Sequence, residues 1–125
     1  MNVEIDSVCE AQIEGIPFAR NVYPMWVFDK ETLAFLEVND AAVLQYGYSR
    51  SEFLTMKIIE IRPPEDVPEL LRRTRVLRNT GPTTGAQWRH RSKRGAVFPV
   101  AITSWDLTFR GRPAELVLAR RERSE

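Results

Sequence analysis

The sequence predicts a single α+β domain in which two groups of strands are separated by short helices. Three observations support this prediction. Apolar, β-favouring runs flank a polar turn in residues 25–38, alternating strands and glycine-containing turns fill residues 86–119, and the segment between them carries several helix caps. A chain of 125 residues, 43% hydrophobic and 28% charged, has the length and composition of one globular domain.

Residues 1–20 predict an amphipathic helix and a lead-in segment. Apolar side chains recur at the three- and four-residue spacing of one helical face, and Gly15 and Pro17 are typical of a helix end. This face is a candidate interface, either with the rest of the domain or with a second copy. Its members are Ile5, Val8, Cys9, Ile13 and Ile16.

Residues 25–28 and 33–38 predict the first two strands. Both runs are short and rich in apolar residues, and the polar residues 29–32 between them are typical of a tight turn. The two runs therefore predict a β-hairpin.

The middle of the chain carries the start and stop signals of short helices. Asn39 and Asp40 are good N-cap residues for a helix that ends at Gly47. Ser49 with Glu52 matches a capping box, which predicts a second short helix directly after the first.

A longer helix is predicted over residues 66–78. Asp66 and Glu69 resemble a capping box with a proline in the first turn, where a missing N–H does no harm. One face is apolar and consists of Val67, Leu70, Leu71, Thr74 and Leu77. The arginines that fall largely off this face are Arg72, Arg73, Arg75 and Arg78.

Three further strands are predicted in the last third of the chain. Residues 86–91 alternate between apolar and arginine-rich positions, residues 98–105 carry apolar groups on both faces, and residues 116–119 are continuously apolar. The continuous run is typical of a central strand that is buried on both faces.

Six strings in this order and spacing are PMWVFD (24–29), FLEVNDAA (35–42), YGYSRSEF (46–53), RPPED (62–66), WRHRSKRG (88–95) and FPV (98–100). Together they resemble a PAS domain, a sensory module of signalling proteins, and they look most like the PAS domains of bacterial multi-domain sensors. The resemblance covers about residues 21–120. Residues 1–20 then form the N-terminal helix and lead-in, and residues 121–125 form a charged tail toward an output domain.

The resemblance implies a five-stranded antiparallel sheet that cups a cavity under the short helices. It also implies sensing without catalysis, in which a small ligand or a protein partner biases a neighbouring helix or protein. Strand alternation and the family strings point these side chains inward: Trp26, Phe28, Val38, Ala42, Tyr46, Ile58, Leu71, Trp88, His90, Val100 and Ile102. Such a cavity suits an apolar or aromatic ligand with one or two polar handles, although the same side chains can also fill a dry core.

The resemblance argues against two cofactors of PAS relatives. Cysteinyl-flavin chemistry needs a cysteine beside the flavin, whereas Cys9 lies outside the matching region. Relatives that bind haem use a histidine on the long helix, whereas His90 lies on a strand. One histidine and one distant cysteine do not provide the convergent ligands of a metal site.

The resemblance also implies partners. We expect a homodimer, and an output domain such as a histidine kinase or a diguanylate cyclase, as in two-component systems, in the same full-length protein or in a separate signalling partner. Many relatives end the last strand with an Asp-Ile-Thr-like string, but Arg121, Glu122 and Arg123 stand here, so the coupling to an output is altered. No apolar run reaches the ~18–20 residues of a membrane span, and a cytoplasmic location is expected.

Two other functions remain open from the residues alone. Asp29, Glu37 and Asp40 could converge in a small cone-shaped α+β enzyme that performs acid–base chemistry. Residues 1–60 carry four basic and ten acidic side chains, whereas residues 61–125 carry fourteen and seven, so the second half could bind phosphate or nucleic acid. The arginines concerned are Arg72, Arg73, Arg75, Arg78, Arg89, Arg91 and Arg94. Pairing with acids of the same domain, a second copy or a partner is the favoured interpretation of this charge split.

Overall fold

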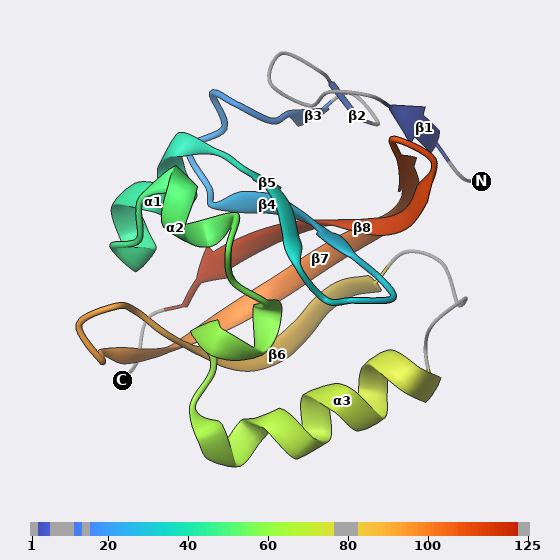
Figure 1. Ribbon diagram of the computed structural model, residues 1–125. Helices are drawn as coiled ribbons and strands as arrows, with labels where there is room; N and C mark the ends of the chain where they lie inside the picture. Colours follow the sequence, from blue (N-terminus) through green and yellow to red (C-terminus); the bar gives the residue numbers. More distant parts are fainter. Residues whose placement is uncertain (1–2, 6–11, 14–15, 77–82, 123–125) are drawn as a thin grey trace.

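The computed structural model describes residues 3–5, 12–13, 16–76 and 83–122. Five antiparallel strands form the main sheet in the order β5–β4–β8–β7–β6 (Figure 1). They are β4 (Met25–Asp29), β5 (Phe35–Val38), β6 (Thr83–Arg91), β7 (Val97–Phe109) and β8 (Arg112–Arg121). The five-stranded antiparallel sheet and the central position of the last strand confirm the predicted α+β fold.

Two turns set the register of the sheet. Between β4 and β5, the Asp29 carboxylate accepts hydrogen bonds from the backbone N–H groups of Glu31 (2.7 Å) and Thr32 (3.1 Å), and it also pairs with Arg112 of β8. Between β7 and β8, Arg110 and Gly111 have φ values of 50° and 77°, the left-handed conformation that a tight hairpin turn needs. The first turn is therefore tied to the central strand by an ion pair.

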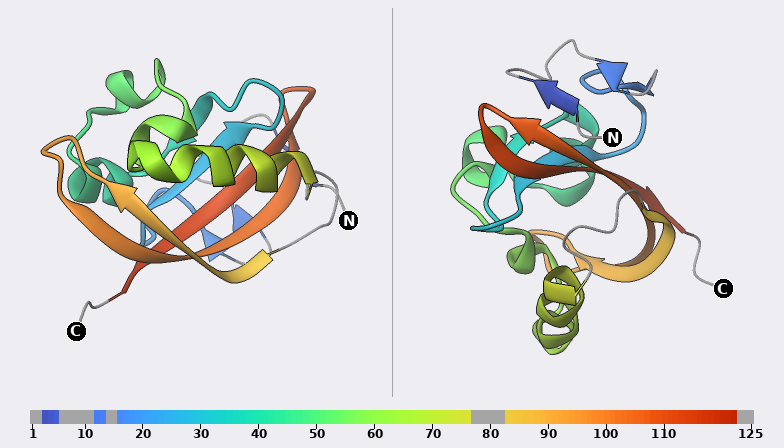
Figure 2. Two further views of the ribbon diagram at one scale, coloured as in Figure 1. Left: turned by 90° about the horizontal axis from the view of Figure 1, so that it is seen from below. Right: turned by 90° about the vertical axis from the view of Figure 1, so that its right-hand side faces the viewer.

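The helices between β5 and β6 cover one face of the sheet. They are α1 (Asp40–Tyr46), α2 (Arg50–Phe53), the 3₁₀ helices η1 (Ile58–Ile61) and η2 (Pro64–Asp66), and α3 (Val67–Val76). Figure 2 shows the helices on one side of the sheet and the N-terminal strands on the other. Among the described residues, no helix is both long and apolar enough to cross a membrane.

The predicted helix caps are present. Asn39 is the N-cap of α1, and Gly47 ends it with a φ of 84°. Ser49 and Glu52 form the reciprocal hydrogen bonds of a capping box at α2. These signals could be read locally because a cap bonds to backbone groups only two or three residues away.

The predicted N-terminal helix is not found in the described part of residues 1–20. That part is extended: β1 (Val3–Ile5) pairs in parallel with the end of β7, and β2 (Gln12–Ile13) pairs with β3 (Ile16–Pro17). Val8 and Cys9 lie outside the described residues. A helical apolar period says nothing about a strand edge far along the chain that offers backbone hydrogen bonds, and β7 offers such an edge to β1.

Each face of the sheet buries its own apolar cluster. The cluster under the helices is the larger one and contains residues from β4 through β8. The cluster on the opposite face consists of Phe18, Met25, Val27, Leu107, Phe109, Ala114 and Leu116. The sheet thus separates an outer core, which the N-terminal segment helps to cover, from an inner core under the helices.

Asn39 connects three parts of the fold through one buried amide. Its Oδ1 atom accepts hydrogen bonds from the N–H groups of Met25 (2.9 Å) and Ala42 (3.0 Å). Its Nδ2 group donates to the carbonyl oxygens of Phe18 (2.9 Å) and Tyr23 (3.0 Å). The side chain therefore joins the lead-in, the start of β4 and the first turn of α1.

We predict that Asn39→Ala lowers the free energy of unfolding by about 2–4 kcal/mol. It removes a helix cap, worth ~1 kcal/mol, and leaves buried backbone groups without partners, at ~1–3 kcal/mol. The measurement is urea denaturation at neutral pH. The matched control is Ser49→Ala, which removes the exposed cap of α2 and should cost only about 1 kcal/mol. Equal losses in the two variants would contradict the role given to Asn39.

Candidate functional site

The predicted cavity residues gather on the inner face of the sheet. Those that are buried there are Trp26, Phe28, Val38, Ala42, Tyr46, Ile58, His90, Val100 and Ile102. Trp88 is half-buried and packs against the same cluster. The alternation of the strands therefore predicted which side chains face inward.

Leu71 was predicted to face inward, and this prediction is wrong. Its side chain is 40% exposed, and Leu70 takes the inner position at 3% exposed. Consecutive residues on a helix point about 100° apart, and both leucines fit an apolar face. Only the placement of α3 alongside β6 decides which of them contacts the core.

An aromatic shell lines the inner face. The Trp26 ring makes edge-on contacts with Phe35 and Tyr46, with centroids 5.8 and 5.6 Å apart, and Tyr46 contacts Phe98 at 5.5 Å. Such edge-to-face pairs are each worth ~0.5–1.5 kcal/mol beyond the area that they bury. The sequence analysis did not select Phe35 and Phe98, although both begin strings that it quoted.

A buried hydrogen bond joins Tyr46 of α1 to His90 of β6. The Tyr46 hydroxyl lies 2.5 Å from Nδ1 of His90, and both side chains are at most 1% exposed. Burial raises the pKa of Tyr46, and burial with the nearby Arg62 charge holds the pKa of His90 well below its usual range. Both groups are therefore neutral at pH 7, so Tyr46 donates to Nδ1 and the ring proton lies on Nε2.

Arg62 adds a buried cation to this pair. It follows η1, is 6% exposed, and its guanidinium carbon lies 4.7 Å from the centroid of the Trp88 ring. Burial lowers its pKa to about 10, which leaves it charged at neutral pH. The sequence analysis missed Arg62 as a site residue, because arginine is usually exposed and the RPPED string was interpreted as fold-making.

Three buried donor atoms around this cluster have no hydrogen-bond partner among the described residues. They are Nε and Nη1 of Arg62 and Nε2 of His90. The nearest acid is not available, because the Asp66 carboxylate receives hydrogen bonds of 3.0 and 2.8 Å from Arg89. Buried donors are normally paired, so this cluster is the part of the inner face best prepared to hold a polar group.

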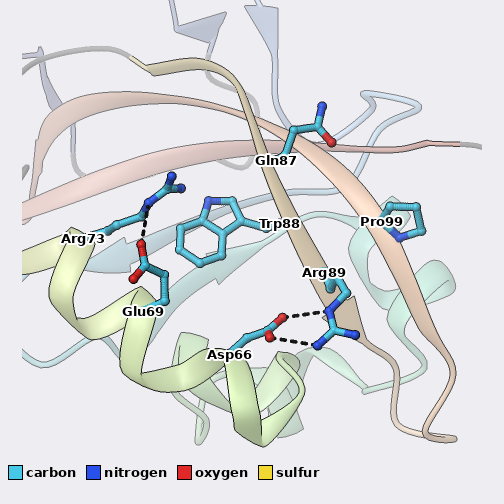
Figure 3. A pocket seen from close by; sticks show the side chains of 7 residues that line it. All are labelled: Asp66, Glu69, Arg73, Gln87, Trp88, Arg89 and Pro99. Atoms are coloured by element: carbon cyan, nitrogen blue, oxygen red, sulfur yellow. Dashed lines mark hydrogen bonds and ion pairs between the residues drawn. The ribbon is translucent and has the colours of Figure 1, made fainter.

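A groove between α3, η2 and β6 reaches the cluster at Trp88 (Figure 3). Its volume is about 370 Å³, and its lining residues are Asp66, Glu69, Arg73, Gln87, Trp88, Arg89 and Pro99. Ion pairs hold its rim: Arg89 binds Asp66, and Arg73 lies 3.2 Å from Glu69. The arginines described here thus pair with acids of the same domain, as the charge pattern predicted.

The carboxylates of the enzyme hypothesis do not converge. Asp29 is bound to its own turn and to Arg112, Glu37 is buried against Arg50 at 2.7 Å, and Asp40 lies exposed in the first turn of α1. Within the described ranges there is also no group of three or more His, Cys, Asp or Glu side chains that could hold a metal ion. The inner face therefore offers hydrogen-bond donors and aromatic surface.

The fold is similar to those of solved sensory domains. A PAS domain from a two-component sensor histidine kinase superposes with a TM-score of 0.72 at 26% identity, over 83% of this chain and 88% of that one. The PAS domain of an HTR-like protein from Haloarcula marismortui gives 0.72 at 18%, over 84% and 85%. A domain of the sensory box sensor histidine kinase/response regulator from Geobacter sulfurreducens gives 0.64 at 21%, over 82% and 86%. No protein-family model and no curated protein matches the sequence.

The buried His90 predicts a specific dependence of stability on pH. Its folded pKa lies below the unfolded value of ~6.5, so the unfolded chain binds the extra proton first. Stability should therefore be complete above pH ~6.5 and fall below it, by up to ~1.4 kcal/mol per pH unit. Urea denaturation between pH ~8 and pH ~5 measures this slope.

The control is His90→Asn, which keeps a polar atom near the Tyr46 hydroxyl and cannot titrate. Because the chain has a single histidine, the difference between the two stability curves isolates this group. Carboxylates such as Asp66, whose pKa the Arg89 hydrogen bond lowers, contribute at lower pH in both proteins. Parallel curves between pH ~5 and ~6.5 would contradict the assignment.

Proposed function

The chain is a PAS domain, and we propose that it is the sensory module of a signal-transduction protein, which binds a small ligand on the inner face of its sheet and catalyses no reaction of its own. The unpartnered donors of Arg62 and His90, set in an aromatic shell, carry this proposal. Buried polar atoms without partners cost folding free energy, and a ligand that pairs them recovers it.

The ligand has an apolar or aromatic body and at least one polar group. The shell supplies aromatic faces and edges from Trp26, Tyr46 and Phe98, which suit such a body. A groove volume of about 370 Å³ next to Trp88 is within the ~300–1,000 Å³ that small-molecule sites occupy. Binding would change the helices over the sheet, since Tyr46 and Arg62 belong to that layer.

The output passes to another domain or protein. Relatives in sensor histidine kinases support a kinase or a similar output domain as the partner, in the same protein or a separate one. The PAS unit spans residues 21–120, residues 121–125 lead toward that output, and the protein acts in the cytoplasm. Dimerisation through the N-terminal residues Ile5, Val8, Cys9, Ile13 and Ile16 stays a prediction.

We expect a small aromatic ligand to perturb only one side of β7. In methyl NMR spectra, Val100 and Ile102 face the inner core, while the alternate residues Ala101 and Thr103 face the other way and serve as controls. Addition of a ligand recovered from the purified protein by native mass spectrometry should shift the first pair and spare the second. Shifts confined to Ala101 and Thr103, or no small molecule bound from any chemical class, would contradict the proposal.

We predict a homodimer that depends on the N-terminal segment. Val22, directly after this segment, is 78% exposed and could extend the apolar contact. Light scattering at tens of micromolar should give the dimer mass for the parent protein and the monomer mass for Ile5→Asp combined with Val8→Asp. A monomer at that concentration contradicts the dimer, and an unchanged dimer in the double variant excludes this segment as the interface.

A further inference from the structure

We infer that the ligand of the inner face carries a carboxylate, which Arg62 and His90 bind beside Trp88. This inference rests on the proposed sensory function and assigns a chemical class to its ligand. The class is a small monocarboxylate with an aromatic or branched aliphatic body. The argument comes from three properties of the cluster: its donors, its charge and its walls.

The unpartnered atoms are all donors. Nε and Nη1 of Arg62 carry N–H groups under any protonation state, and Nε2 of His90 carries the ring proton because the Tyr46 hydroxyl occupies Nδ1. A ligand that satisfies them must present acceptor atoms. A carboxylate presents two oxygens with about four lone-pair sites, enough for three N–H groups.

The cluster also lacks a counter-charge. Arg62 is buried as a cation, and the acid that influences it, Asp66, is already held by Arg89. Stacking on Trp88 offsets only part of the desolvation of a buried cation, because a cation–π contact supplies ~2 kcal/mol at most sites whereas burying an ion costs several. An anion beside Arg62 would provide the missing compensation, and charge-assisted hydrogen bonds are the stronger kind.

Two further arginines make the surroundings positive. The guanidinium of Arg73 lies 4.8 Å from the centroid of the same Trp88 ring, and that of Arg121 lies 4.4 Å from the centroid of Phe98. Glu69 pairs with Arg73 and is half-exposed on the groove rim, so it does not neutralise the buried side. A cationic ligand is therefore disfavoured at this end of the inner face.

The walls fit a compact apolar body. Trp88 belongs to both the groove and the cluster, and Trp26 and Phe98 continue the aromatic surface inward through Tyr46. Three donors and one fully buried cation match the single charge of a carboxylate, whereas a phosphate has more oxygens to satisfy. A monocarboxylate on an aromatic ring is thus the simplest ligand that uses every unpaired donor.

The test compares matched acids and amides. Benzoate and phenylacetate are titrated against the full chain at neutral pH by calorimetry and thermal shift, with benzamide and phenylacetamide as neutral analogues of the same shape. We expect each acid to bind at least about tenfold more tightly than its amide, a difference of ~1.4 kcal/mol. Inorganic phosphate serves as a bare anion and should bind more weakly than either acid.

Three variants locate the effect. Arg62→Met keeps the apolar stem without the charge and should bring acid and amide to within about twofold, while Arg62→Gln repeats the test if the methionine variant folds poorly. His90→Asn should weaken acid binding by a smaller factor. Arg72→Met is the control, because Arg72 is exposed on α3 and paired with Glu69 at 2.7 Å, and it should bind like the parent.

Several outcomes overturn the inference. Equal binding of acids and amides, an acid preference that survives in both Arg62 variants, or phosphate binding as tight as benzoate would each exclude a dedicated carboxylate site. A neutral or cationic molecule retained by the purified protein would exclude it as well and would leave the sensory function standing. The sensory function itself fails separately, when no small molecule of any class binds.

Discussion

The buried amide of Asn39 is the interaction on which the arrangement of this domain depends. Its four hydrogen bonds, of 2.9–3.0 Å, fix where the lead-in ends, where β4 begins and where α1 leaves the sheet. From that fixed start, α1 carries Tyr46 across the inner face to His90. A side chain that satisfies both acceptor and donor groups from three segments lowers the cost of burying all of them. The inner face is thus positioned by one residue that does not line it.

The inner face combines a closely packed aromatic shell with a polar cluster that is only partly satisfied. Packing and the Tyr46–His90 bond stabilise the layer of helices on the sheet, whereas the unpaired donors of Arg62 and His90 oppose it. Native cores rarely retain such a cost without a use for the group. In a sensory module the two terms have a natural meaning, because a ligand that pairs the donors changes the stability of the helical layer by linkage.

Local signals predicted local structure well, and they failed where distant segments decide. The caps at Asn39, Gly47 and Ser49 were readable because each bonds within a few residues. The inner positions of β7 followed from alternation, since a strand repeats every two residues. The choice between Leu70 and Leu71, and the extended β1 in place of a helix, depend on where α3 and β7 lie, which no local period encodes.

The amino-acid sequence by itself determined the α+β class, the order of the strands and helices, and most side chains of the inner face. These features follow from capping chemistry and from the periods of helices and strands, which act over a few residues. The tertiary structure alone decided that Arg62 is buried against Trp88, that Asp66 is taken by Arg89, and that His90 meets Tyr46. Those contacts join residues 23 to 44 positions apart, or bury a residue type that is usually exposed, so only the packing of η1, α1 and β6 against one another could reveal them.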